Sequence, residues 1–216
     1  SSKNKYQHIY AILNLHYGPQ HWWPAESPFE VMVGALLVQN TTWQNASTAV
    51  SKLKQAGLMS PSAIMKTSID HLASIIVSSG CYNIKARRLM ALCAWLRDQG
   101  DFDQLKLRKR RVLRKDLLEV YGIGPETADD ILLYALDKPV FVIDAYTRRL
   151  FSRLGLIEHD DTYEKLQQCF EDALEENVKV FNQFHALIVK HAKNACQKIP
   201  RCENCCLQNE CPQWCK

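Results

Sequence analysis

The fold of this chain is decided by the stretch Leu117-Leu-Glu-Val-Tyr-Gly-Ile-Gly-Pro-Glu-Thr-Ala128. Gly122 and Gly124 bracket a single apolar residue between two helical stretches. Pro125 can restart a helix, because proline is well tolerated in a first helical turn. Such a hairpin presents backbone N–H groups at a helix N-terminus, where they can bind phosphate. The stretch therefore predicts two helices joined by a phosphate-binding turn.

A carboxylate follows the hairpin, because the apolar run Val140-Phe-Val-Ile143 leads into Asp144. A phosphate-binding turn followed by a carboxylate suggests an enzyme that holds DNA and acts on it. The pattern G-I-G-P-E-T-A, then V-I-D-A-Y, resembles the helix-hairpin-helix, Gly/Pro-rich, Asp (HhH-GPD) superfamily of DNA glycosylases. Endonuclease III, the mismatch adenine glycosylases and the bacterial endonuclease III-type 3-methyladenine glycosylases belong to this superfamily. The resemblance covers nearly the whole chain, but Glu126 stands where bifunctional members carry a lysine.

Apolar residues recur with helical spacing almost throughout the chain. The segments concerned are 51–54, 69–77, 85–96, 111–120, 127–136, 146–154, 163–174 and 178–195. No segment alternates as a strand with hairpin turns, so we expect an all-α fold. The family resemblance implies two lobes and a tail: a six-helix barrel at 28–138 that contains the hairpin, a second helical lobe from 1–27 and 139–195, and a cluster loop at 196–216.

Composition excludes some classes of protein and favours a nucleic-acid partner. The 216 residues are 47% hydrophobic and 23% charged, which is typical of a globular protein. No apolar run approaches the roughly 20 residues that span a bilayer, and the first residues lack the apolar core of a signal peptide. The net charge of +4 is weak evidence, but residues 106–115 carry seven positive charges just before the hairpin. We favour contact with the DNA backbone over a merely solvated helix face.

Six of the nine cysteines lie between Cys196 and Cys215, and this clustering suggests metal binding rather than disulfides. The spacing C-x5-C-x2-C-x5-C joins Cys196, Cys202, Cys205 and Cys211. Thiolates bind both zinc and iron–sulfur clusters. Endonuclease III-type enzymes carry a similar C-x6-C-x2-C-x5-C motif around a 4Fe–4S cluster, so the resemblance implies that cofactor, with zinc as the alternative. Cys206 could replace Cys205 as the third ligand. We expect Cys81, Cys93 and Cys169 to be buried as small apolar residues.

Two short aromatic segments are candidates for a base pocket: His21-Trp22-Trp23-Pro24 and Gln39-Asn40-Thr41-Thr42-Trp43. Enzymes that act on a base must extrude it from the duplex, whereas aromatic residues in general also pack in cores. Endonuclease III-type 3-methyladenine glycosylases have a WWP motif and an aromatic residue after Q-N-T. The resemblance implies that Trp22, Trp23, Pro24 and Trp43 line the pocket and that Gln39 fills the hole left by the flipped base. A methylated purine is cationic, and aromatic faces attract cations.

The segment Gly80-Cys-Tyr-Asn-Ile-Lys-Ala86 matches the family's G-x-Y-N-x-K-A loop. There, Tyr82 and Cys81 would lie near the DNA wedge; alternatively, Tyr82 packs under the loop. Lys85 would contact phosphate, together with Gly122, Gly124 and Thr127 of the hairpin. In contrast, Phe184-His-Ala-Leu187 departs from the F-H-G-K segment of the 3-methyladenine branch, which leaves the substrate open.

Asp144 can cap the following helix, worth ~1 kcal/mol, and can also be catalytic. The expected reaction is hydrolysis of an N-glycosidic bond, with Asp144 stabilising the oxocarbenium ion and orienting or deprotonating water. Glu126 cannot form a Schiff base, so we expect a monofunctional enzyme.

The sequence therefore predicts a glycosylase acting on double-stranded DNA, with an alkylated purine such as 3-methyladenine as the favoured base. From the family we expect a monomer in the bacterial cytoplasm, associated with the nucleoid and not with a membrane. Three alternatives remain: an endonuclease III-like or mismatch (uracil, thymine or adenine) glycosylase, a non-catalytic protein that binds damaged DNA, and a metal-dependent redox protein.

Overall fold

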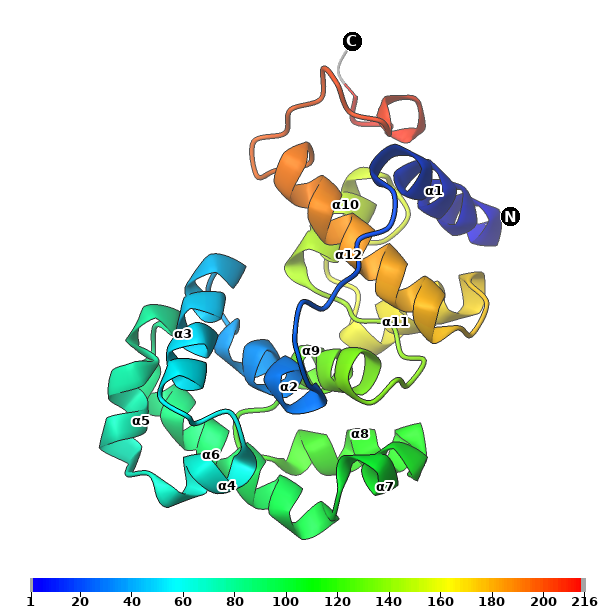
Figure 1. The fold of residues 1–216 in the computed structure, drawn as a ribbon. Helices are drawn as coiled ribbons and strands as arrows, with labels where there is room; N and C mark the ends of the chain where they lie inside the picture. Colours follow the sequence, from blue (N-terminus) through cyan, green and yellow to red (C-terminus); the bar gives the residue numbers. More distant parts are fainter. Residues whose placement is uncertain (1, 215–216) are drawn as a thin grey trace. The chain divides into compact units, whose positions relative to one another are not determined.

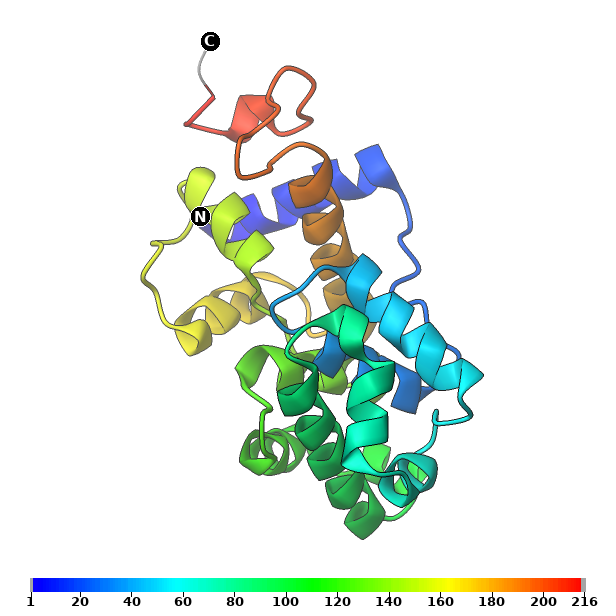
Figure 2. The same cartoon turned by 90° about the vertical axis from the view of Figure 1, so that its left-hand side faces the viewer.

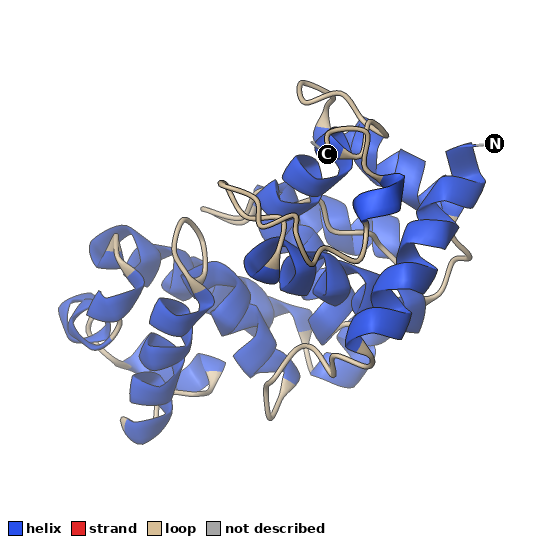
Figure 3. Cartoon of the chain, turned by 90° about the horizontal axis from the view of Figure 1, so that it is seen from above, coloured by secondary structure: helices blue, strands red, loops and turns tan. Residues whose placement is uncertain are grey.

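The structure is a computed structural model that describes residues 2–214, and its regular elements are all helical (Figure 3). This confirms the predicted all-α class. The chain forms two compact units, Trp23–Lys138 and Ser1–Trp22 with Pro139–Lys216. The helices, labelled in Figure 1, are α1 (Ser2–Tyr17), α2 (Pro28–Leu37), α3 (Trp43–Gln55), α4 (Pro61–Lys66), α5 (Ile69–Ile75), α6 (Tyr82–Gln99), α7 (Phe102–Leu107), α8 (Arg110–Glu119), α9 (Pro125–Asp130), α10 (Ala145–Arg153), α11 (Tyr163–Ala173) and α12 (Val178–Asn194).

The unit Trp23–Lys138 is built around α2, in which every residue from Phe29 to Leu37 is buried. A helix that is apolar on all sides must lie inside a core, and α2 packs against α3, α6 and α9. On the outer part of this unit α4 and α5 both pack against α6, as the two perpendicular views show (Figures 1 and 2). Short polar residues start the helices here: Ser27, for example, accepts a bond from the backbone N–H of Glu30 (3.1 Å).

The hairpin forms where the sequence predicts it, between α8 and α9. Gly122 adopts φ +82°, and Pro125 is the first residue of α9. Arg114 of α8 binds both carboxylate oxygens of the fully buried Asp129 of α9, at 2.9 and 3.2 Å. This paired contact holds the two helices together across the turn. After α9 the chain continues as a π-helical turn, Ile131–Ala135.

The other unit has an aromatic core between α1, α10, α11 and α12. Phe141 stacks on Phe170 with 4.3 Å between ring centroids, and Tyr6 of α1 packs against both Phe151 and Phe170. Phe184 of α12 completes the cluster. α12 therefore packs against α1 on one side and α10 on the other.

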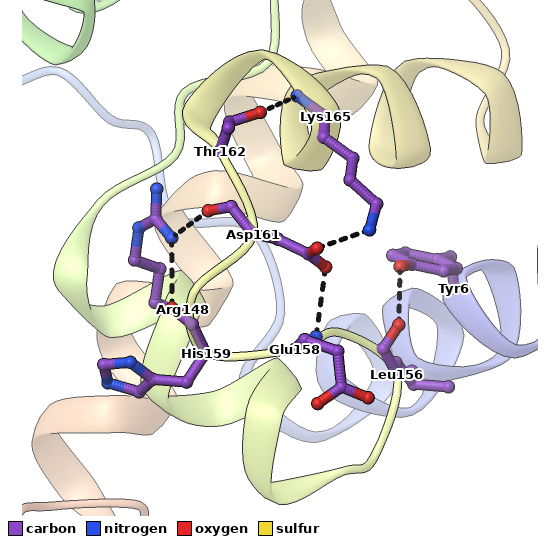
Figure 4. A network of polar contacts seen from close by, with 8 residues as sticks. All are labelled: Tyr6, Arg148, Leu156, Glu158, His159, Asp161, Thr162 and Lys165. Carbon is purple, nitrogen blue, oxygen red and sulfur yellow. Dashed lines mark hydrogen bonds and ion pairs between the residues drawn. The ribbon is translucent and has the colours of Figure 1, made fainter.

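The connection from α10 to α11 is held by polar contacts centred on Asp161 (Figure 4). Arg148 donates to the carbonyl oxygen of Asp161 (2.8 Å), and the Asp161 carboxylate accepts from the backbone N–H of Glu158 (3.1 Å) and pairs with Lys165. Thr162 caps α11 through the N–H of Lys165. These bonds fix α10 relative to the rest of its unit.

The three cysteines outside the tail differ in their surroundings. Cys93 is buried in α6, as expected, and burial raises the pKa of its thiol to about 12. Cys169 is partly exposed. The expectation for Cys81 is wrong: this residue is exposed and adopts a left-handed backbone conformation (φ +44°) immediately before α6. The sharp turn into the helix places its side chain in solvent.

Among the described residues, no helix is long and apolar enough to cross a membrane.

The hairpin should be sensitive to a side chain at Gly122. A Cβ there would lie 2.2 Å from Cγ of Arg88, whereas a Cβ at Gly57, which has a similar φ of +69°, would meet open space. Gly57→Ala should therefore cost ~1 kcal/mol in backbone strain alone. Gly122→Ala should cost a further ~1–3 kcal/mol from overpacking. Urea unfolding of both variants measures the difference; equal losses would contradict the close packing of Arg88 on the turn.

Candidate active site and metal-binding loop

Asp144 is the N-cap of α10 and is 8% exposed. Its Oδ1 accepts hydrogen bonds from the backbone N–H of Thr147 (2.7 Å) and from the Thr147 hydroxyl (2.9 Å). The predicted capping role is therefore confirmed. Because the carboxylate sits at a helix N-terminus, the helix dipole also favours its negative charge.

The second oxygen of Asp144 contacts a residue for which the sequence analysis assigned no role. Oδ2 lies 2.8 Å from Nε2 of His185, which belongs to α12 and is 5% exposed. Burial alone would raise the pKa of Asp144, but the charge and hydrogen bond of His185, together with the Thr147 bonds, hold it below the ordinary value. The only signal in the sequence was the position of His185 in the segment that departs from the family's F-H-G-K pattern.

Basic groups lie on the same unit, close to the start of α10. The Arg149 guanidinium lies 5.3 Å from the ring centre of Tyr146, and the Lys193 ammonium lies 5.7 Å from it. Lys193 is exposed at the surface; its charge also interacts with that of Asp144, and the partial burial of its ammonium lowers its pKa. Positive charge of this kind can attract a phosphate to the surface beside Asp144.

In the unit Trp23–Lys138, Gln39 is bonded to the hairpin. Its amide nitrogen donates to the carbonyl oxygen of Gly122 (3.0 Å) and to the hydroxyl oxygen of Thr127 in α9 (2.9 Å). Arg88 of α6 donates to the amide oxygen of Gln39 (2.7 Å). The structure thus brings together Gln39, Gly122 and Thr127, which the sequence had suggested for two different roles. Gly124 stays exposed at the start of α9.

The structure corrects the role assigned to Lys85. Its side chain is buried, at 2% residue exposure, and Nζ donates to the carbonyl oxygens of Leu37 (2.8 Å) and Ser79 (2.6 Å). Burial also lowers the pKa of its ammonium. An ammonium that satisfies two internal carbonyl groups braces the loop before α6 and does not reach a DNA phosphate. Tyr82, three residues earlier, is 40% exposed at the first position of α6.

The two aromatic segments that the sequence singles out contact each other through one tryptophan of each, Trp23 and Trp43. The ring of Trp23 contacts that of Trp43 edge-on (5.2 Å, 89°), and Gly34 of α2 leaves room for both rings. These two residues and Pro24 line a cavity of about 370 Å³, together with the Glu30–Lys54 ion pair (2.8 Å). Trp22, which belongs to the other unit, does not line this cavity.

Only part of the basic stretch before the hairpin is available to an external partner. At least three of its charges pair within the unit: Lys106 with Asp137 (3.1 Å), Arg108 with Asp116, and Arg114 with Asp129. The exposed cations are Lys109, Arg111 and Lys115. The same stretch therefore both stabilises the hairpin and carries surface charge.

The four cysteines of the predicted motif line one small cavity of about 70 Å³ after α12; they are Cys196, Cys202, Cys205 and Cys211. Arg153 lies 3.3 Å from Sγ of Cys196, and His191 lies 3.5 Å from Sγ of Cys205. Cys206 does not line the cavity, and its sulfur lies 4.0 Å from the opposite ring nitrogen of His191. Cys215 lies outside the described residues.

Within residues 2–214 no three or more His, Cys, Asp or Glu side chains are arranged to hold a single metal ion. Tetrahedral zinc requires four sulfur atoms, each about 2.3 Å from one ion. Thiolates also hold clusters with several irons, each iron bound by one thiolate.

Comparison with known proteins identifies relatives over nearly the whole chain. A model of the HhH-GPD superfamily of base excision DNA repair proteins matches residues 33–176. A protein of Methanocaldococcus jannaschii, provisionally named a DNA repair glycosylase, is 40% identical over 97% of this chain and 98% of its own length. Endonuclease III of Sulfolobus acidocaldarius is 28% identical over 86% of this chain and 82% of its own length.

Solved structures agree with these relatives. The 3-methyladenine DNA glycosylase of H. pylori, solved with bound 1,N6-ethenoadenine, is 31% identical, with a TM-score of 0.76 over 89% of this chain and 97% of that one. An endonuclease III–DNA complex has a TM-score of 0.84 over 98% of this chain and 96% of that one at 20% identity, and so shares the fold.

Proposed function

The chain belongs to the HhH-GPD superfamily of base excision DNA repair glycosylases, and we propose that it is a monofunctional N-glycosylase that removes an alkylated purine such as 3-methyladenine from double-stranded DNA. We further propose that it acts as a monomer. The observation that carries the proposal is the buried carboxylate of Asp144 at the start of α10, which Thr147 and His185 hold by hydrogen bonds.

Asp144 can assist both steps of hydrolysis: the loss of the base and the attack of water on the sugar. When the bond between the sugar C1′ and the base nitrogen breaks, the electron pair of that bond leaves with the base. Positive charge then develops on the sugar. A fixed carboxylate stabilises that charge without reorganising, because its hydrogen bonds to Thr147 and His185 already hold it in place. The same carboxylate can orient water and accept a proton as the water oxygen bonds to C1′.

The tryptophan cavity supports the choice of substrate. Trp23 and Trp43 offer aromatic surface to a volume of about 370 Å³, which can accommodate a purine-sized group. A purine methylated at a ring nitrogen carries positive charge, and aromatic rings attract such a cation. The name of the 31%-identical H. pylori neighbour gives 3-methyladenine as that enzyme's base.

A second candidate is a bifunctional enzyme that also cleaves the DNA strand. Glu126 is exposed at the start of α9 and has no amine, which favours the monofunctional reading. However, Lys190 and Lys193 are exposed amines on α12, and the charge of Lys193 interacts with that of Asp144. Lys193 is therefore the residue that would carry such chemistry if it occurs.

We propose that the cysteine loop holds a 4Fe–4S cluster, with zinc as the alternative. The donor set fits, because four thiols line one cavity and Arg153 and His191 lie against two of the sulfurs. When bound, the cluster would cross-link residues 196–211 and so brace the loop. The exposed side chains of Lys198 and Arg201 would then face solvent from an ordered loop, where they can contact phosphate.

The role of Asp144 can be separated from its capping role by Asp144→Asn, because asparagine caps helices as well as aspartate does. Excision of 3-methyladenine in single-turnover assays on duplex oligonucleotides should fall by ~10²-fold or more, while the unfolding temperature changes little. Asp101→Asn is the matched control, because Asp101 caps α7 through the N–H of Gln104 (2.8 Å). Wild-type rates are expected for this control.

The same assay, run on duplexes that carry uracil, thymine mismatches or oxidised pyrimidines, tests which base the enzyme removes. Faster removal of one of these bases than of 3-methyladenine would replace the proposed substrate. Full excision by Asp144→Asn would leave Asp144 a helix cap only. Tight binding of damaged duplex with no excision of any base would favour the non-catalytic alternative.

Borohydride trapping tests the monofunctional reading. A protein without a Schiff-base lysine should give no covalent adduct with DNA that contains an abasic site. Glu126→Lys is a positive control for detection, because it places an amine at the family position. A strong adduct formed by the wild-type protein and lost in Lys193→Gln would establish the bifunctional alternative.

The cavity geometry predicts which cysteines bind metal. Cys205→Ser should lose its metal and its absorbance near 400 nm, whereas Cys206→Ser should keep both, because Cys205 lines the cavity and Cys206 does not. Iron and zinc analysis of the purified variants measures this. Zinc in place of iron in the wild-type protein would contradict the cluster, and equal losses in both variants would contradict the ligand assignment.

A further inference from the structure

The carboxylate of Asp144 has one hydrogen bond that helix capping does not require. An N-cap needs only a side-chain oxygen that accepts from an N–H of the first turn, and Oδ1 does this with Thr147. The bond to Oδ2 comes from a different helix, α12, through Nε2 of His185 at 2.8 Å. His185 therefore contributes something beyond the start of α10.

Burial makes this second contact energetically necessary. The side chains of Asp144 and His185 are 10% and 7% exposed, so the carboxylate has little access to water. A buried charge without a partner favours its neutral form. A protonated Asp144 could neither stabilise a positively charged sugar nor accept a proton from water.

We propose that His185 is a positioning residue for catalysis: its Nε2–H donates to Oδ2 of Asp144, which fixes the plane of the carboxylate and keeps it ionised in a buried site. This inference rests on the proposed function, in which Asp144 is catalytic. It differs from a purely structural role, because it predicts a change in the pH dependence of excision when the donor is removed.

The direction of that change follows from the groups that face Asp144. Among the described residues, the ionisable side chains that interact with it include His185 and Lys193, and both belong to α12, a helix packed against α10. His185 lowers the pKa of Asp144 and burial raises it. Removing His185 leaves burial less opposed, so the pKa of Asp144 rises. The acid limb of the excision profile, where Asp144 becomes protonated, must therefore move to higher pH.

The same sign applies to folding stability. Because the folded-state pKa of Asp144 is depressed, its contribution is present above the ordinary carboxyl value of 3.8 and is lost as pH falls through the lowered value. Without His185 this loss begins at a higher pH.

The experiment compares His185→Phe, which removes the donor, with His185→Gln, whose amide can still donate but cannot be protonated. Single-turnover excision is measured against pH, and unfolding temperature is measured alongside. We expect the rate of His185→Phe to fall ~10- to 100-fold, with its acid limb at higher pH. His185→Gln should recover to within a few-fold of wild type. His71→Phe is the control, because His71 is exposed on α5, and it should match wild type.

Wild-type rate and pH profile in His185→Phe would overturn the inference, as would His185→Gln behaving no better than His185→Phe. If His185→Phe does not fold, His185→Ala takes its place, because it removes the donor without adding volume; a wild-type rate and pH profile in that variant would overturn the proposal.

A measurement without turnover separates this inference from the proposed function. Carbon-13 NMR of labelled aspartate follows the titration of the Asp144 carboxyl in wild type and in the His185 variants. An upward shift supports the positioning role even if no excised base is found, in which case only the proposed function fails. An unchanged titration of Asp144 would overturn the role of His185, whatever the activity of the wild type.

Discussion

The constraint on which this site depends is the burial of a negative charge at the start of α10. Asp144 is nearly inaccessible to solvent, and its carboxylate stays ionised because three hydrogen bonds compensate for lost hydration. Two of the bonds come from Thr147 in its own helix and one comes from His185 in α12. The same contacts therefore begin a helix, join two helices, and prepare a fixed charge for a cationic transition state.

In the unit Trp23–Lys138, side-chain hydrogen bonds hold the tight turn of the hairpin in one conformation. Gly122 gives the hairpin its positive φ, but a glycine alone leaves the backbone free to change. Gln39 ties the Gly122 carbonyl to Thr127 of α9, and Arg88 holds Gln39. A residue that resembles a DNA-inserting glutamine in sequence is thus also part of the turn's own hydrogen-bond network.

The sequence predicted features that depend on local patterns, and failed where tertiary contacts decide. The amphipathic helices, the hairpin and the Asp144 cap are local, and they formed as expected. α2 escaped detection because it is apolar on all sides and shows no period. The prediction that Lys85 contacts phosphate was wrong, because a lysine near a DNA-binding motif is usually expected to lie on the surface. Only the folded chain brings the carbonyl oxygens of Leu37 and Ser79 to its ammonium.

α10 also gives the cysteine loop a physical connection to the carboxylate. Arg149 donates to the carbonyl oxygen of Cys196 (2.9 Å), and Arg153 donates to those of Gln197 (2.6 Å) and Lys198 (2.9 Å). Asp144 caps the opposite end of this nine-residue helix. A helix this short transmits displacement as a nearly rigid body, because its backbone bonds resist bending. Any group that orders the cysteine loop therefore also restricts where α10, and with it the Asp144 carboxylate, can lie.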